Sequence, residues 1–227
     1  MNIVIENITC AVLIFQILLI FLLRILFSAE EYGYYLLYLF AQLLNVFCSH
    51  LQNNINPFSA WLSPYVFVCI DSFVSILMAI LYLAFYIRVI PLAEKLPSVY
   101  KLSLKIQRLI FYYLFIHILL CFAGLGFIGI YVFFLLLAFD LFLVIIGIRT
   151  MYKNAESYMV ILLVAGVFIA IIGIIVSIMY YVFDSAEADI ISVYYIFLPG
   201  TIIETSLFTA GLIYKAYSSV RIRNKLE

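Results

Sequence analysis

Four ionisable side chains lie deep inside long apolar stretches of the chain: Asp71, His117, Asp140 and Glu204. At 1.5 Å per helical residue, each would lie on the order of 13 Å or more from the nearer membrane surface. A charge at that depth costs about 2.5–3.5 kcal/mol, so such residues usually face a bundle interior and act on ligands or protons. The four residues therefore predict a shared intramembrane polar site. The alternative left open is that they hydrogen-bond between helices or stay protonated, and only fix the packing.

The composition requires a membrane around these residues. Apolar residues make up 68% of the 227 residues, and charged residues only 11%. A soluble domain is about half apolar and a quarter charged, and it could not bury this much apolar surface. Apolar runs of about 18 residues or more are typical of membrane-spanning helices. The chain is therefore predicted to be an all-α, polytopic membrane protein.

The apolar sequence divides into seven segments, which predict a seven-transmembrane helix bundle. These are Thr9–Phe27, Tyr34–Leu51, Trp61–Ile90, Leu109–Ala123, Leu125–Met151, Ser157–Phe183 and Ile190–Tyr217. The stretch 109–148 has roughly 40 residues, twice what one crossing needs. Gly124, Gly126 and Gly129 in "AGLGFIG" permit a tight reversal. We therefore predict a helical hairpin at this point.

The basic residues predict the orientation of the bundle. All 12 Lys and Arg residues fall at loops or helix ends on one face of the seven-helix arrangement. The other face carries Glu6, "HLQNNINPF" and the acidic loop "DSAEAD". Lys and Arg are enriched on the cytoplasmic side of membrane proteins. We therefore expect residues 1–8 to form a short extracytoplasmic N-terminus, 9–217 the transmembrane module, and 218–227 a basic cytoplasmic tail.

The last apolar segment and its tail contain candidates for signal relay. Pro199 lacks a backbone N–H and predicts a kink close to Glu204. Lys215, Arg221 and Arg223 follow where the segment leaves the membrane. A helix patterned in this way could pass a motion to an effector. The alternative is plain anchoring, because each basic residue near anionic headgroups is attracted by about 1 kcal/mol.

Small polar residues also recur in this segment at four-residue steps: Thr201, Thr205 and Thr209. Residues of this size allow neighbouring transmembrane helices to approach closely and to hydrogen-bond across the interface. The spacing places them on one helical face. We interpret this face as a packing seam first and a ligand contact second.

Motifs for catalysis or for metal binding are lacking in the sequence. It contains two histidines and four separated cysteines, Cys10, Cys48, Cys69 and Cys121. There is no CxxC or HExxH motif, no phosphate loop, and no Ser/His pairing with a nucleophile elbow. The sequence therefore predicts no enzyme, no metal and no cofactor. The basic residues form no single patch, so nucleic-acid binding is not predicted either.

A small secondary transporter is the alternative function. Transporter folds usually contain two related halves and helices broken near the midplane. Seven unequal segments without an internal repeat do not divide into two such halves. A receptor is therefore favoured over a transporter.

Three stretches together resemble the membrane module of the bacterial seven-transmembrane receptors with diverse intracellular signalling modules. "SAEEYGYYLLYLFAQLL" is similar to the family's polar turn and Tyr-rich second helix. "YIRVIPLAEKLPSVYKL" is similar to its aromatic and basic exit from the third helix. "PGTIIETSLFTAGLIYKAYSSVRIRNKLE" is similar to its final helix, which has a glutamate near the middle and a basic exit. The resemblance covers nearly all of the chain.

The resemblance implies a sensor in the bacterial cytoplasmic (inner) membrane. It would relay an extracytoplasmic or intramembrane signal, carried by an unknown ligand, through the seventh helix. The receiving partner would be a cytoplasmic effector, such as a kinase, a cyclase or a regulator, in cis or in trans. Other expected partners are the lipid bilayer and a second copy of the chain in a homodimer. Glu204 is the buried acid that matches the family pattern, whereas Asp71, Asp140 and His117 rest on depth alone.

Members of this family usually carry a sensory domain before the first helix and an output domain after the last. Eight residues precede the first apolar segment here, and the sequence ends at Glu227. The basic tail is therefore expected to be a connector from which the output domain is absent.

Overall fold

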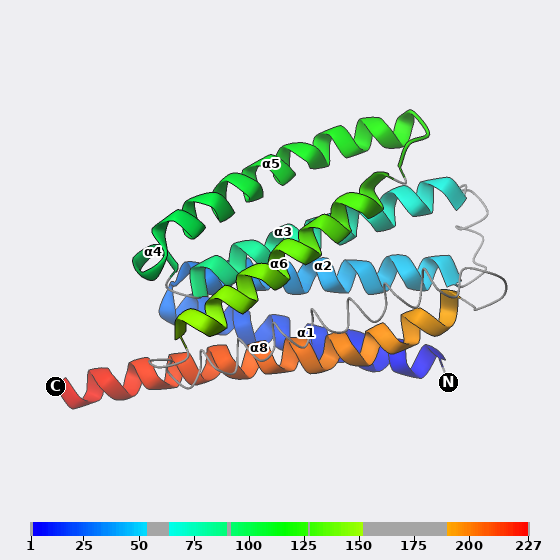
Figure 1. The fold of residues 1–227 in the computed structure, drawn as a ribbon. Coiled ribbons are helices and arrows are strands. Elements are labelled where there is room, and N and C mark those ends of the chain that lie inside the picture. The colour runs from blue at the N-terminus through cyan, green and yellow to red at the C-terminus, as the bar shows by residue number, and fades with distance from the viewer. Residues whose placement is uncertain (1, 54–63, 90–91, 127, 152–189, 227) are drawn as a thin grey trace. The chain divides into compact units, whose positions relative to one another are not determined.

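The computed structural model describes residues 2–53, 64–89, 92–126, 128–151 and 190–226, and nearly all of these residues are helical (Figure 1). The helices are α1 (Asn2–Phe27), α2 (Glu30–Asn53), α3 (Pro64–Val89), α4 (Leu92–Lys95), α5 (Pro97–Phe122), α6 (Ile128–Met151) and α8 (Ile190–Leu226). These ranges contain no strand, which confirms the all-α prediction. The segment Ser157–Phe183, predicted as the sixth crossing, lies outside the described residues.

Within the described ranges, three helical stretches are long and apolar enough to cross a membrane. They are Val4–Phe27 in α1, Ser72–Val89 in α3 and Pro97–Phe122 in α5. By length and composition, these stretches identify the chain as a membrane protein. The number of seven crossings and the orientation stay predictions.

The chain divides into two compact units, and each is described here by itself. The first unit comprises Met1–Leu36 and Leu141–Glu227, and the second comprises Leu37–Asp140. In the first unit, α1 packs along α8. In the second unit, α3 packs against α5, and the short α4 packs against the same helix.

The surface of α1 has the polarity expected of a helix in lipid. Its buried face includes Glu6, Thr9, Leu13, Gln16 and Ile20, which recur at steps of three and four residues. Its exposed residues are large and apolar, among them Ile14, Phe15, Leu18, Leu22 and Leu26. A soluble helix places its polar residues outward. The opposite arrangement fits a helix whose outer face contacts acyl chains and whose inner face contacts other helices.

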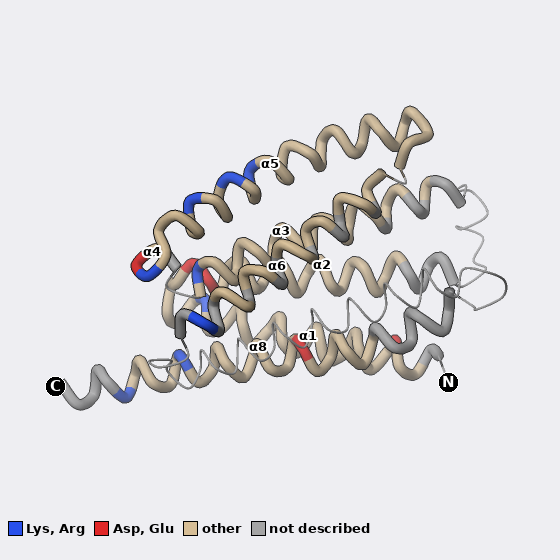
Figure 2. Tube along the Cα trace, viewed as in Figure 1, with Lys and Arg blue, Asp and Glu red and all other residues tan. Residues whose placement is uncertain are grey.

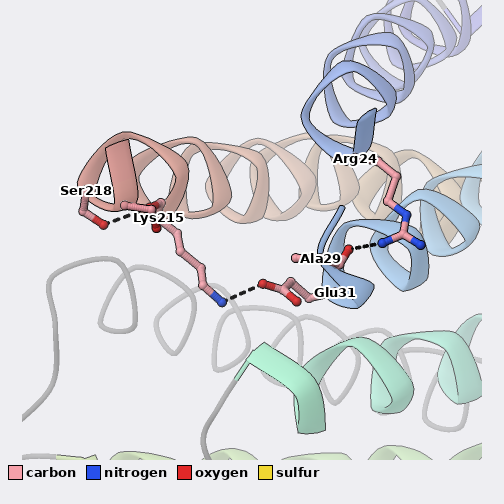
Figure 3. A network of polar contacts seen from close by, with 6 residues as sticks. Arg24, Ala29, Glu31, Lys215 and Ser218 are labelled. Atoms are coloured by element: carbon pink, nitrogen blue, oxygen red, sulfur yellow. Dashed lines mark hydrogen bonds and ion pairs between the residues drawn. The ribbon is translucent and has the colours of Figure 1, made fainter. Parts of the chain in front are cut away.

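A two-residue turn connects α1 to α2 in the first unit. Ser28 adopts the left-handed conformation (φ 51°), and its N–H donates to the Arg24 carbonyl at 3.0 Å. The guanidinium of Arg24 donates through Nη1 to the carbonyl of Ala29 (Figure 3). Glu30 and Glu31 then begin α2, where acidic side chains complement the positive end of the helix dipole. The hydrogen bonds made by Ser28 and Arg24 therefore hold the turn between α1 and α2 in place.

An apolar core holds the second unit together. Its buried members are Ile76, Ala79 and Ile80 of α3, Ile110 and Leu114 of α5, and Leu136 of α6. Tyrosines of α2 and α3 form a second cluster, in which the rings of Tyr82 and Tyr86, both on α3, stack with centroids 5.8 Å apart. Tyr38 packs against Tyr82, and its hydroxyl accepts a hydrogen bond from Gln42 Nε2 at 2.7 Å. Apolar and aromatic packing thus joins the described helices of this unit.

The predicted hairpin in "AGLGFIG" is confirmed. Helix α5 ends at Phe122 and α6 begins at Ile128. Gly124 has φ 79°, a conformation that a residue with a Cβ rarely adopts. The N–H of Leu125 donates to the Leu120 carbonyl at 2.8 Å and closes the end of α5. Gly129 differs from the expectation, because it lies inside α6 and allows a close helix contact instead of a turn.

Two helices are longer than their apolar segments predict. Helix α5 begins at Pro97, not at Leu109, because Pro at the first turn favours a helix start and the following Lys, Leu and Gln residues are good helix formers. Helix α8 has 37 residues, passes through Pro199 and continues to Leu226. Its length is about 55 Å, compared with about 30 Å for the bilayer core. The predicted tail is therefore helical.

Candidate functional site

An ion pair holds α8 to the first turn of α2 in the first unit. Lys215 Nζ lies 2.7 Å from Glu31 Oε1, and both side chains are largely buried (24% and 13% exposed) (Figure 3). The carbonyl of Lys215 accepts hydrogen bonds from the hydroxyls of Ser218 at 2.8 Å and Ser219 at 2.9 Å. These serine hydroxyls bond within the helix, so α8 continues as a helix past this point.

One helical turn after Glu31 on α2, Tyr35 contacts the face of α8 that carries Thr201, Thr205 and Thr209, which we call the threonine seam. Its hydroxyl donates to the Thr205 carbonyl at 2.7 Å and lies 3.2 Å from Thr209 Oγ1. Thr205 in turn donates to the Thr201 carbonyl at 2.8 Å. Tyr35 and all three threonines are buried. The predicted packing seam is thereby confirmed.

A third contact joins α8 to α1. Gln16 Nε2 donates to Ser206 Oγ at 3.1 Å. Helices α1 and α8 run in the same direction (Figure 1). The pairs Glu31–Lys215 and Tyr35–Thr205 show that α2 begins in the opposite direction. Polar contacts thus hold α8 at two levels along its length, one at Thr205 and Ser206 and one at Lys215.

Glu204 lies among these contacts. Its side chain is 4% exposed, so the structure places a carboxyl group inside the first unit, as its position in the sequence predicts. It lies close enough to Tyr35 for the two side chains to interact electrostatically. The buried carboxyl therefore adjoins the hydrogen bonds through which α2 holds α8.

His117 forms the polar centre of the second unit. Its ring is fully buried on α5, and Nε2 lies 2.8 Å from Ser72 Oγ on α3. The Ser72 hydroxyl also donates to the Cys69 carbonyl at 3.1 Å. Among the described residues, Nδ1 has no hydrogen-bond partner. Cys121 Sγ, one turn along α5, lies 3.6 Å from Nε2.

A glycine of α6 accommodates the imidazole ring. A Cβ atom added to Gly129 would lie 2.4 Å from His117 Cε1 and 3.0 Å from Nδ1. Contacts below 3.0 Å are essentially absent between real Cβ atoms and their neighbours. The backbone of α6 can therefore approach α5 at this position only because residue 129 is glycine.

The Ser72–His117 distance is that of a nucleophile and its base, but the surroundings differ from those of a hydrolase. Ser72 lies inside the continuous helix α3, where the main-chain N–H groups bond within the helix and leave no free pair to stabilise an oxyanion. Both side chains are buried, at 5% and 0% exposure. The geometry fits a hydrogen bond that joins two helices.

Thiols and carboxylates do not gather into a metal centre in the part of the chain that is described. No group of three or more His, Cys, Asp or Glu residues there has a suitable arrangement. Cys10, Cys48, Cys69 and Cys121 are all free thiols.

The other predicted residues fall on described helices. Asp71 lies in α3 and Asp140 in α6, both in the second unit, but their side chains are outside the described part. Pro199 is exposed within α8, and so is Arg221. Arg223 also lies in this helix. Because Glu204 belongs to the first unit and His117 to the second, the site shared by all four ionisable residues stays a prediction.

Sequence reasoning missed the partners of the buried groups. It did not single out Ser72, Gln16, the contact of Tyr35 with α8 or the pairing of Glu31 with Lys215. A signal existed for Ser72, because α3 places it one turn before the core residue Ile76. Nothing in the sequence indicated which polar residue of another helix would face it.

Comparison with protein-family models, with curated protein sequences and with solved structures finds no match to this chain.

Proposed function

We propose that the chain is the membrane module of a bacterial signal receptor, in which α8 relays a signal to a cytoplasmic effector. The observation that carries the proposal is the length of α8: 37 residues form one helix. About 20 residues are enough to cross the bilayer core. The remaining length would extend as a rigid rod into the aqueous phase. Such a rod can pass rotation or translation to whatever follows it.

The contacts along α8 suit a helix that changes position. Gln16, Tyr35 and Glu31 each contact it through a polar bond from α1 or α2. Hydrogen bonds between transmembrane helices contribute about 0.6 kcal/mol on average, because alternative partners are available. Two positions of α8 could therefore differ by only a few kcal/mol. A ligand or a proton acting at Glu204 would shift the balance between them.

The directions of α1 and α8 support the proposed topology of seven crossings. Helices α1 and α8 run parallel, as the first and last helices must if the number of crossings is odd. In the proposed arrangement, seven helices cross the membrane, with the N-terminus outside and the C-terminus in the cytoplasm. Reporter fusions after Asn53 and Ser185 should then report an extracytoplasmic location, and those after Leu96 and Asn154 a cytoplasmic one. A single reversed fusion would contradict the arrangement.

The relay can be tested by joining the end of α8 to the first helix of a histidine kinase core. Single alanines are then added at the junction, in steps over two helical turns. If α8 acts as a continuous rod, kinase autophosphorylation should rise and fall with a period of about 3.6 residues. A matched series with a flexible Gly/Ser junction should show no period, because such a linker transmits no rotation.

A flat response in the alanine series would rule out relay through α8. Vesicles that contain the unmodified chain provide the test against the transporter alternative. Flux of a solute down an imposed gradient, absent from empty vesicles, would assign the protein to transport and overturn the receptor proposal.

A further inference from the structure

The N-terminal half of α5 carries a row of basic residues on one face. Lys101, Lys105 and Arg108 follow one another at steps of four and three residues, and all three are exposed. Such spacing places them in one line along the helix. Figure 2 shows Lys and Arg gathered on the part of α5 that adjoins α4, with the rest of α5 free of charge. We call these three residues the α5 basic row.

The α5 basic row lies opposite the face that packs into the protein. The buried residues of α5 are Ser103, Ile110, Leu114 and His117. At 100° per residue, their mean direction is about 180° away from that of the basic row. The row therefore points directly away from α3 and the core.

The same outward face becomes apolar further along the helix. Tyr112 (66% exposed) follows Arg108 in line, and Phe115 (59%) and Leu119 (67%) continue the face toward the end of α5. From Leu109 to Phe122 this apolar part has a length of about 21 Å. Along this face, cations are followed by a tyrosine and then by apolar side chains. This order matches the parts of a phospholipid that they would contact: the headgroup, the interface and the acyl chains.

No described residue of the protein neutralises this row. Among the described residues, Lys215 pairs with Glu31, and Arg24 and Arg88 donate to backbone carbonyls. The structure gives the three members of the α5 basic row no hydrogen bond or ion pair with any described residue. Helix α5 itself contains no Asp or Glu. The counter-charge must therefore come from outside the described chain.

We propose that the α5 basic row binds the headgroup of an anionic phospholipid, with its acyl chains along Tyr112, Phe115 and Leu119. The row spans about 10 Å of helix axis, slightly more than one headgroup layer of about 5–7 Å. Its deepest member, Arg108, would reach the headgroups by extending its side chain along the helix. An anionic headgroup at this point neutralises a cation that would otherwise lie at the edge of the apolar layer. The site does not depend on the proposed receptor function.

The test is a titration of the purified full chain in detergent with phosphatidylglycerol and, separately, with phosphatidylcholine. Bound lipids are counted by native mass spectrometry. The unchanged chain should prefer phosphatidylglycerol. In the triple variant Lys101→Gln/Lys105→Gln/Arg108→Gln, its affinity should fall about fivefold for each charge removed, which corresponds to about 1 kcal/mol per charge. The affinity for phosphatidylcholine should not change.

A matched control removes the same number of charges elsewhere. The variant Arg149→Gln/Arg221→Gln/Lys225→Gln lies on α6 and α8 and should lose clearly less affinity for phosphatidylglycerol than the triple variant of the row. Lys101→Arg with Lys105→Arg keeps the charge of the row and should also retain the affinity. This second variant keeps the test decisive if the triple variant folds poorly.

Three results would overturn the proposal. The triple variant could bind phosphatidylglycerol within twofold of the unchanged chain. The control variant could lose as much affinity as the triple variant, which would mean that net charge, and not the row, attracts the lipid. Inorganic pyrophosphate could displace the lipid completely, which would assign the row to a soluble phosphate compound.

Discussion

The two units of the chain hold their helices together by different means. In the first unit, α8 contacts α1 and α2 through polar bonds at two levels, one at Thr205 and Ser206 and one at the Glu31–Lys215 pair. In the second unit, α3, α5 and α6 share an apolar core, and the buried His117–Ser72 bond adds to it.

This difference has a physical consequence for motion. Polar bonds between helices in lipid are individually weak and can be exchanged for others, whereas a packed core resists displacement because close-packed side chains have no alternative positions. The first unit is therefore suited to a helix that moves, and the second to one that stays in place. If this contrast holds, substitutions that add volume should harm the second unit most, and loss of a single polar contact should harm the first unit little.

The largest effect is expected for Gly129→Ala. The added Cβ would overlap His117 Cε1 at 2.4 Å, and the buried, hydrogen-bonded ring cannot move aside freely. Overpacking of this kind costs about 1–3 kcal/mol, which exceeds the gain of up to about 1 kcal/mol from replacing a helical glycine. The free energy of unfolding, measured by SDS titration in mixed micelles, should fall by about 2 kcal/mol.

Gly33→Ala in the first unit is the matched control. A Cβ there would lie 3.5 Å from Arg24 Nε, which is an ordinary contact. This variant should be as stable as the unchanged chain or slightly more stable. The two glycine variants would contradict the contrast between the units if they had equal effects. The cost of Gly129→Ala should also shrink in a His117→Ala background, because the overlapping ring is then absent.

The role of Gly129 also shows where sequence reasoning ends. Composition was enough to predict membrane-spanning helices, and the glycines of "AGLGFIG" were enough to predict a reversal, since both are local properties. The pattern assigns Gly129 to that turn. In the structure, a glycine is needed at this position because the ring of His117, on the preceding helix, leaves no room for a Cβ. A local pattern cannot distinguish a glycine needed for backbone conformation from one needed for close approach.

The buried histidine illustrates the same division. Its depth in an apolar segment predicted that His117 would be an interior residue, and the burial is confirmed. The cations at positions 101, 105 and 108 mark the outward face of α5, so the inward face could be deduced as well. The hydrogen-bond partner of His117 could not be deduced, because Ser72 is 45 residues away and the choice of neighbouring helix is a tertiary property. The pairing of Glu31 with Lys215 could not be predicted either, because 184 positions separate them in the sequence.

A second prediction compares one hydrogen bond from each unit. Ser72→Ala removes the bond to His117 Nε2 and leaves this nitrogen the weak contact with Cys121 Sγ at 3.6 Å, which should cost about 1–2 kcal/mol. Tyr35→Phe removes a hydroxyl from the threonine seam. It should cost only about 0.6 kcal/mol, because the Thr209 hydroxyl can bond within α8 instead. The same SDS titration measures both changes in the free energy of unfolding.

Two substitutions at the same positions serve as controls. Ser72→Thr keeps a hydroxyl group and should retain most of the stability. Tyr35→Leu removes the ring that packs on Phe208 at 5.9 Å as well as the hydroxyl, so it should cost more than Tyr35→Phe. A larger loss for Tyr35→Phe than for Ser72→Ala would reverse the proposed contrast.

The smallest effect is expected for Gln16→Leu on the buried face of α1. The substitution removes the bond to Ser206, which contributes about 0.6 kcal/mol on average in such a setting. It also removes Oε1, a buried oxygen without a hydrogen-bond partner among the described residues, and replaces the amide with an apolar group of similar volume. The two changes should nearly cancel, so the free energy of unfolding should stay within about 0.5 kcal/mol of the unchanged chain. Gln16→Ala, which leaves a void, should be less stable than Gln16→Leu. A loss of more than about 2 kcal/mol for the leucine variant would show that the polar bonds of α8 are strong, not exchangeable, and would remove the physical basis for a moving helix.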